Sequence, residues 1–178
     1  LSGQRRDLLQ IWTLLDFTGA RPSEISQLQV SEIILGHPIP HVVIQERDDR
    51  TLKTSWSTRE VPLVGAALQA AAQVVRGVND PTAPAFPRFY GEGGMDRLSQ
   101  ALKRRIRALT KDKRHVPYSL RHNMKDRMRA KEIFQDTARA IQGHAYTGGE
   151  DAAYGGPASL EQKRDALVKA LGGYRESL

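Results

Sequence analysis

Five side chains in this chain could together break and rejoin a phosphodiester bond. They are two arginines, a lysine, a histidine and a tyrosine, found at Arg21, Lys53, Arg121, His144 and Tyr154. Arginine holds phosphate oxygens through paired charged hydrogen bonds, and it acts where negative charge develops in the transition state. A tyrosine oxygen can attack phosphorus, and a lysine ammonium can protonate the oxygen that leaves. This chemistry requires neither a metal ion nor a cofactor, and we expect neither.

These residues stand within short phrases whose order and spacing are more specific than any phrase alone. In that order the phrases resemble the catalytic domain of the tyrosine recombinases, also called phage-type integrases, from about residue 14 to residue 156. The phrases are Thr18-Gly19-Ala20-Arg21-Pro22-Ser23-Glu24, Lys53-Thr54-Ser55-Trp56-Ser57-Thr58-Arg59-Glu60-Val61-Pro62-Leu63, Tyr118-Ser119-Leu120-Arg121-His122, Gly143-His144 and Tyr154-Gly155-Gly156.

The resemblance implies a fold and an activity. The fold would be mostly α-helical with a small antiparallel sheet (α+β), the catalytic core of DNA breaking-rejoining enzymes. The activity would be site-specific recombination or integration of double-stranded DNA through a covalent 3′-phosphotyrosine link, with release of a 5′ hydroxyl. Family members act as homo-oligomers, so we expect a tetramer on DNA and a monomeric or weakly associated state without it.

We expect residues 1–178 to form a single C-terminal catalytic domain. The chain opens with Leu1 rather than Met, directly in an amphipathic segment, which suggests a piece of a longer protein. The family's N-terminal helical domain, which closes the other side of a DNA clamp, is absent from these residues. We therefore expect weak DNA binding by this piece alone. The resemblance also implies an origin in an integrated phage or mobile element and a cytoplasmic, nucleoid-associated location in a bacterial host.

The resemblance assigns a role to each of the five residues. Arg21 and Arg121 would hold the non-bridging phosphate oxygens, and a neutral His144 would donate a hydrogen bond to one of them. Lys53 would act as the general acid from a hairpin, and Tyr154 as the nucleophile. The simpler alternatives are a helix-start ion pair, a solvated helix arginine, a carbonyl-capping histidine, an exposed hairpin lysine and an ordinary loop tyrosine.

Three neighbouring residues qualify this assignment. Glu24 would orient Arg21 from behind, and His122 matches the family's second histidine, which packs or buttresses. Tyr146 is a rival nucleophile, but it follows His144 by only two residues, which is too close for the family pattern.

Tyr118 departs from the family pattern, which most often has histidine three residues before the second arginine. A phenol can hydrogen-bond a phosphate oxygen, but it is a poor base at neutral pH. Three interpretations remain open. Tyr118 binds phosphate while another group takes the proton, or the site is slow, or the domain has lost cleavage and kept DNA binding.

A basic composition supports a polyanionic partner. The net charge is +7, from 27 Lys and Arg against 20 Asp and Glu, and the sequence pI is about 9.9. Such a balance favours nucleic acid over a membrane surface. The chain has no cysteine and no apolar run of the length that a membrane span needs. Proposed phosphate contacts, for which solvated charge is an equally good interpretation, are Arg59, Lys103, Arg104 and Arg107, with Lys111, Lys113 and Arg114 nearby.

Periodicity predicts a helical chain around one sheet. Val42, Val43 and Ile44 mark a β-segment, and Ser119 suits a helix N-cap. Residues 79–94 contain several prolines and glycines and predict a long surface loop. The expected helices are 4–17, a short one from Pro22, 65–78, 95–110, 119–129, 132–142 and 159–171; the expected strands are 41–46, 51–54 and 58–63.

Two other functions remain open. One is a non-catalytic DNA-binding module derived from a recombinase, which Tyr118 favours. The other is a topoisomerase-like enzyme that relaxes DNA without site preference. A metal-dependent nuclease is disfavoured, because the sequence has no compact cluster of carboxylates or histidines with ligand spacing.

Overall fold

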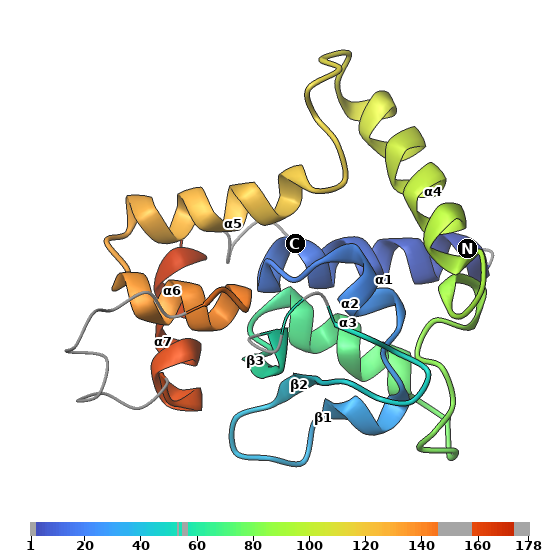
Figure 1. The fold of residues 1–178 in the computed structure, drawn as a ribbon, viewed down its shortest axis with the longest axis horizontal. Helices are drawn as coiled ribbons and strands as arrows, with labels where there is room; N and C mark the ends of the chain where they lie inside the picture. The colour runs from blue at the N-terminus through green and yellow to red at the C-terminus, as the bar shows by residue number, and fades with distance from the viewer. Residues whose placement is uncertain (1–2, 53, 55–56, 146–157, 173–178) are drawn as a thin grey trace.

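The computed structural model describes residues 3–52, 54, 57–145 and 158–172. Within them the fold is mostly helical, with a three-stranded antiparallel sheet, as the α+β class predicts (Figure 1). In chain order the elements are α1 (Gly3–Thr18), α2 (Pro22–Ser26), η1 (Val30–Glu32), β1 (Ile33–Ile34), β2 (His41–Ile44), β3 (Arg59–Pro62), α3 (Ala66–Val75), η3 (Pro87–Phe89), α4 (Gly94–Leu109), α5 (Ser119–Ala130), α6 (Gln135–Gln142) and α7 (Leu160–Ala170).

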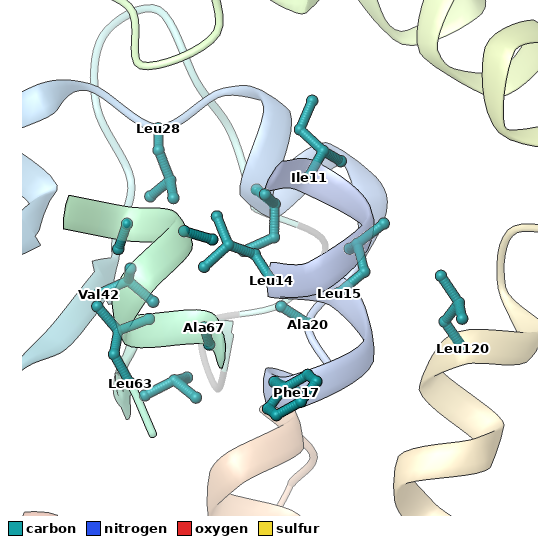
Figure 2. Packing of buried hydrophobic residues seen from close by; sticks show 14 of the residues in the cluster. Ile11, Leu14, Leu15, Phe17, Ala20, Leu28, Val42, Leu63, Ala67 and Leu120 are labelled. Carbon is teal, nitrogen blue, oxygen red and sulfur yellow. The ribbon is translucent and has the colours of Figure 1, made fainter. Parts of the chain in front are cut away.

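Helix α1 forms the centre of the core. It packs against α3 on one side and α5 on the other, and it also contacts α2 and α4 (Figure 1). Its apolar residues recur three and four positions apart, so Ile11, Leu14 and Leu15 share the buried side of the helix. Figure 2 shows these side chains together with Val42 of the sheet and Ala67 of α3. Burial of each such side chain contributes about 1.5–3 kcal/mol.

The end of α1 is set by Gly19. This glycine has φ +66°, a conformation that side chains rarely adopt. A Cβ atom there would lie 2.8 Å from the Cγ atom of Met124, so the missing side chain also lets the α1–α2 turn approach α5. Pro22 then occupies the first turn of α2, where its missing N–H costs no hydrogen bond. The result places the backbone just before Arg21 beside helix α5.

The sheet has the strand order β1-β2-β3. Strand β2 pairs with β3 from His41–Pro62 to Ile44–Arg59. The third strand is β1 rather than the expected 51–54, so that prediction was wrong. Arg47 and Arg50 exchange backbone hydrogen bonds of 3.0 Å and close a tight turn, after which Thr51 and Leu52 pair with no strand.

Two further expectations differ from the structure. Residues 79–94 are not only a surface loop, because Phe86 and Phe89 around η3 are buried in the core. The end of α4 projects beyond the core, so Leu109 is 68% exposed (Figure 1). The N-cap of α5 is Tyr118, and Ser119 instead accepts a 3.0 Å hydrogen bond from the backbone N–H of Val116.

The last described helix, α7, packs against α5, α6 and β3 (Figure 1). Its N-cap is Ser159, whose hydroxyl accepts a hydrogen bond from the N–H of Gln162 at 3.2 Å. Lys163 is buried and donates to the Glu60 carbonyl of β3 at 2.7 Å. The expected helix 159–171 is therefore confirmed. In the part of the chain that is described, no helix combines the length and apolar character needed to cross a bilayer.

Candidate functional site

The first half of the candidate site is built on the start of α2. Arg21 donates from Nη1 to Glu24 Oε1 at 2.5 Å, and its backbone N–H donates to Glu24 Oε2 at 2.7 Å. Glu24 is only 3% exposed, whereas the Arg21 side chain is 15% exposed. The carboxylate thus holds the arginine from the buried side in an ion pair at the start of α2, and part of the guanidinium remains open to solvent.

Arg59 lies behind the same carboxylate. It donates from Nη2 to Glu24 Oε2 at 2.8 Å and from Nη1 to Oε1 at 3.2 Å. Its Nε donates to the carbonyl of Ile141 at the end of α6, at 2.8 Å. Arg59 was expected among the phosphate contacts, but its donors point into the protein, where Glu24 and Ile141 accept them.

The second half of the candidate site is built on α5 and the residues after α6. Arg121 is 3% exposed and donates to the carbonyl of Gly19 at 2.8 Å, 102 residues away in sequence. It also donates to the carbonyl of Gln142, and its Nη2 lies 2.9 Å from His144 Nε2. Gln142 returns a 3.2 Å hydrogen bond from its side chain to the Arg121 carbonyl. The fold therefore brings Arg121 and His144 into direct contact.

Electrostatics connect the two halves. Burial, followed by the charge of Arg21, lowers the pKa of Arg121, and Arg59 acts in the same direction while Glu24 opposes it. An arginine nevertheless remains charged at neutral pH. Cations of both halves thus lie within electrostatic range of one another, with Glu24 as the intervening anion.

His144 is kept neutral by its surroundings. The residue is exposed, and its Nε2 lies beside Arg121. Partial burial and then the charge of Arg121 lower the pKa of His144, and three further cations add to the effect: Arg21, Lys125 and Arg59. A neutral imidazole keeps one N–H donor and one acceptor. At neutral pH His144 can therefore donate a single hydrogen bond, as its proposed role requires.

Burial disfavours the ionised form of Glu24, but its interactions with two arginines outweigh this effect. Desolvation raises the pKa of the carboxyl, and the hydrogen bonds and charges of Arg59 and Arg21 bring it below its ordinary value. The carboxylate is therefore ionised at neutral pH and stabilises both arginines.

Tyr118 and His122 lie at the start of α5. Tyr118 is 41% exposed, and its ring meets that of His122 edge to face at 5.0 Å between centroids. Its hydroxyl group is close enough to influence the pKa of Arg121. His122 is exposed, so it contacts Tyr118 at the surface and does not buttress the site from within the core.

Lys53, Tyr146 and Tyr154 lie outside the described residues. Thr54, the residue after Lys53, places its hydroxyl 3.1 Å from the hydroxyl of Ser57. Ser57 is buried and lies 3.3 Å from Nη1 of Arg21. The phrase that begins with Lys53 thus reaches the Arg21 side of the site. Sequence reasoning assigned no role to Ser57, although its place in that phrase was a usable signal.

The basic residues of α4 have different surroundings. Lys103 and Arg104 are exposed. Arg107 donates to the carbonyls of Asp112, Lys113 and His115 at 2.8, 3.2 and 3.1 Å. Arg107 therefore organises the loop between α4 and α5, whereas Lys103 and Arg104 present their charges to solvent.

A second ionic network was not predicted. Glu32 is 2% exposed and accepts hydrogen bonds from Arg47 at 2.5 Å and Arg50 at 2.7 Å. A pocket of about 390 Å³ adjoins this network and Arg21. Arg121 and His144 do not line this pocket. Its lining residues are Arg21, Ser23, Glu24, Gln27, Asp49, Arg50, Thr51, Leu52, Gly91, Glu92 and Met95.

No protein-family model, no curated protein and no solved structure matches the chain. Among the residues described, no group of three or more His, Cys, Asp and Glu side chains could hold a metal ion. The site is thus defined by its geometry: two arginines and a neutral histidine gathered from α2, α5 and the end of α6.

Proposed function

We propose that this chain is the catalytic domain of a site-specific tyrosine recombinase or integrase acting on double-stranded DNA. The observation that carries the proposal is the gathering of Arg21, Arg121 and His144 around one cationic site. Their phrases are widely separated in the sequence, and two arginines with a hydrogen-bond donor suit the oxygens of one phosphodiester.

The proposed reaction exchanges one ester bond for another. The oxygen of Tyr154 forms a bond to phosphorus and gives its proton to water, while the bond from phosphorus to the 5′ oxygen breaks. The 5′ oxygen receives a proton from Lys53, and the DNA keeps its 3′ phosphate on the tyrosine. Reversal with another 5′ hydroxyl rejoins the strand, so no external energy source is required.

The cations also make the tyrosine nucleophile easier to ionise. A free phenol has a pKa of about 10, so ionising it at pH 7 costs about 4 kcal/mol. Nearby positive charge lowers that cost, and proton removal during attack avoids part of it. Tyr154 follows His144 by ten residues, a length that spans up to about 35 Å when extended. The chain is therefore long enough to bring its hydroxyl to the site.

The proposal extends to partners and location. A tetramer would assemble on DNA, in the cytoplasm of a bacterial host, from a protein encoded by a phage or mobile element. The non-catalytic DNA-binding module remains the second candidate, because Tyr118 stands where the family most often has a histidine base.

A trapping experiment tests the catalytic proposal. The substrate is a pool of duplexes randomised around one 5′-bridging phosphorothioate, whose released thiol does not rejoin and needs no general acid. With chelator present, we expect a covalent protein–DNA adduct that survives denaturing gels, disappears in Tyr154→Phe and persists in Tyr146→Phe. DNA binding without any adduct would select the non-catalytic module, and an adduct that persists in Tyr154→Phe would refute the assignment of the nucleophile.

A further inference from the structure

Arg59 bridges the two halves of the candidate site. Its hydrogen bonds reach Glu24, which holds Arg21, and the carbonyl of Ile141, three residues before His144. A fourth bond, from Nη1 to the carbonyl of Ser57 at 2.7 Å, fixes the guanidinium to the segment just before β3. One planar group therefore connects α2, β3 and the end of α6.

The guanidinium is committed to these partners. Arginine has five N–H donors, and four hydrogen bonds here use four of them. Protein acceptors take these four donors, so they are not available to a ligand from solvent. A lysine could not replace Arg59, because one ammonium cannot reproduce the planar fork that grips both carboxylate oxygens.

Gly143 provides the space for this group. It adopts φ +64° at the C-cap of α6, where glycine is favoured. A Cβ atom at this position would lie 2.6 Å from Nη1 and 2.9 Å from Cζ of Arg59. Any side chain at residue 143 would therefore push the guanidinium away from Glu24 or from Ile141.

We infer that Arg59 is a positioning residue that sets the spacing between Arg21 and His144, and that Gly143 is required because it leaves room for the Arg59 guanidinium. The expected effect of Arg59 on catalysis rests on the proposed function. The expected effect of Arg59 on the placement of His144 does not rest on it, since the position and surroundings of the His144 ring can be measured without any reaction.

The experiment compares Arg59→Met, Arg59→Lys and Gly143→Ala with two controls. Arg164→Met removes a surface arginine paired to Asp165, and Gly36→Ala adds a methyl group where nothing lies within 4 Å. We expect adduct formation with the phosphorothioate pool to fall roughly 10- to 100-fold in all three test variants. This range is typical when a residue that orients the ligand-binding side chains is lost. Both controls should match the unmodified chain.

The His144 imidazole gives a second readout by NMR titration. The cations that face it are Arg121, Arg21, Lys125 and Arg59, and all of them hold its pKa down. Arg59→Met should therefore raise the titration midpoint, and Gly143→Ala should shift the imidazole resonances. Arg59→Lys keeps the charge and loses the planar fork, so it should shift the imidazole resonances with little change in the titration midpoint, and it replaces Arg59→Met if that variant does not fold.

The two proposals can fail separately. In one outcome, the test variants fold with lower stability while the His144 signals and the adduct rate stay unchanged. That result would overturn the positioning role of Arg59 and leave the recombinase proposal standing. If the unmodified chain forms no adduct, the NMR readout still decides: moved His144 signals support the spacing role of Arg59, and unmoved signals overturn it.

Discussion

At the residue scale, the site depends on a few ionic contacts that the sequence phrases only partly reveal. The motifs identified Arg21, Glu24, Arg121 and His144, and the fold places these side chains in mutual contact or electrostatic range. The role of Arg59 could not be predicted, because its partners Glu24 and Ile141 are far from it in sequence. A phrase shows which residue types are present, but their orientation depends on tertiary packing.

Tyr118 is the residue that most directly sets the expected rate. Under the proposed function, Tyr118→His would provide a base at neutral pH three residues before Arg121. General base catalysis contributes about 10²- to 10⁴-fold, so we expect adduct formation at least about tenfold faster. The control is Tyr118→Phe, which keeps the ring contact with His122 and removes only the hydroxyl group. Equal adduct rates for Tyr118→His and the unmodified chain would show that proton removal is not limiting.

Glu24 makes stability depend on pH. Because its pKa is lowered in the folded state, its contribution is complete above the unfolded value of about 4.3 and is lost as the pH falls through the folded value. Between pH 7 and pH 3, chemical denaturation should show a larger loss of unfolding free energy for the unmodified chain than for Glu24→Gln. Equal losses of unfolding free energy in the two proteins would contradict this account of Glu24.

Glu24→Gln should also destabilise the protein at pH 7. Removing the carboxylate leaves Arg21 and Arg59 without their shared anion, and breaking a buried pair typically costs about 3–5 kcal/mol. Asp165→Asn on α7 is the matched control, because the Asp165 side chain is 67% exposed in its ion pair with Arg164. Surface changes of this kind usually stay within about 0.5 kcal/mol.

At the element scale, helices were the most predictable part of the fold. Apolar periodicity predicted the helices 4–17, 95–110 and 159–171, which are α1, α4 and α7, because a one-sided apolar stripe requires a core to cover it. The two-residue strand β1 has no such period. The burial of Phe86 and Phe89 was also missed, since their proline-rich surroundings are typical of loops.

Gly19 links the elements that carry the two arginines. We expect Gly19→Ala to lower the unfolding free energy by about 1–3 kcal/mol, because alanine is strained at φ +66° and its methyl group would meet Met124 of α5. The measurement is chemical denaturation, with Gly36→Ala as a control in open space. Equal stabilities would show that α1 and α5 do not need this close approach.

At the scale of the whole molecule, a net charge of +7 favours DNA through its phosphates. Binding of a generic duplex should weaken as salt increases. Arg104→Gln should reduce the slope of log affinity against log salt by about 1, as the loss of one phosphate contact does, while Arg164→Gln should leave it unchanged. Fluorescence anisotropy measures both slopes, and equal slopes for Arg104→Gln and the unmodified chain would show that Arg104 makes no phosphate contact.

The central claim is that Tyr154 attacks phosphorus while Arg21, Arg121 and His144 hold the ester. Mass spectrometry of the trapped adduct tests it most directly. Cleavage after Arg139 and Lys163 releases residues 140–163, which contain both Tyr146 and Tyr154, and fragmentation separates the two tyrosines. We predict a nucleotide joined through its 3′ phosphate to Tyr154. A nucleotide on Tyr146 or on any other residue would contradict the account.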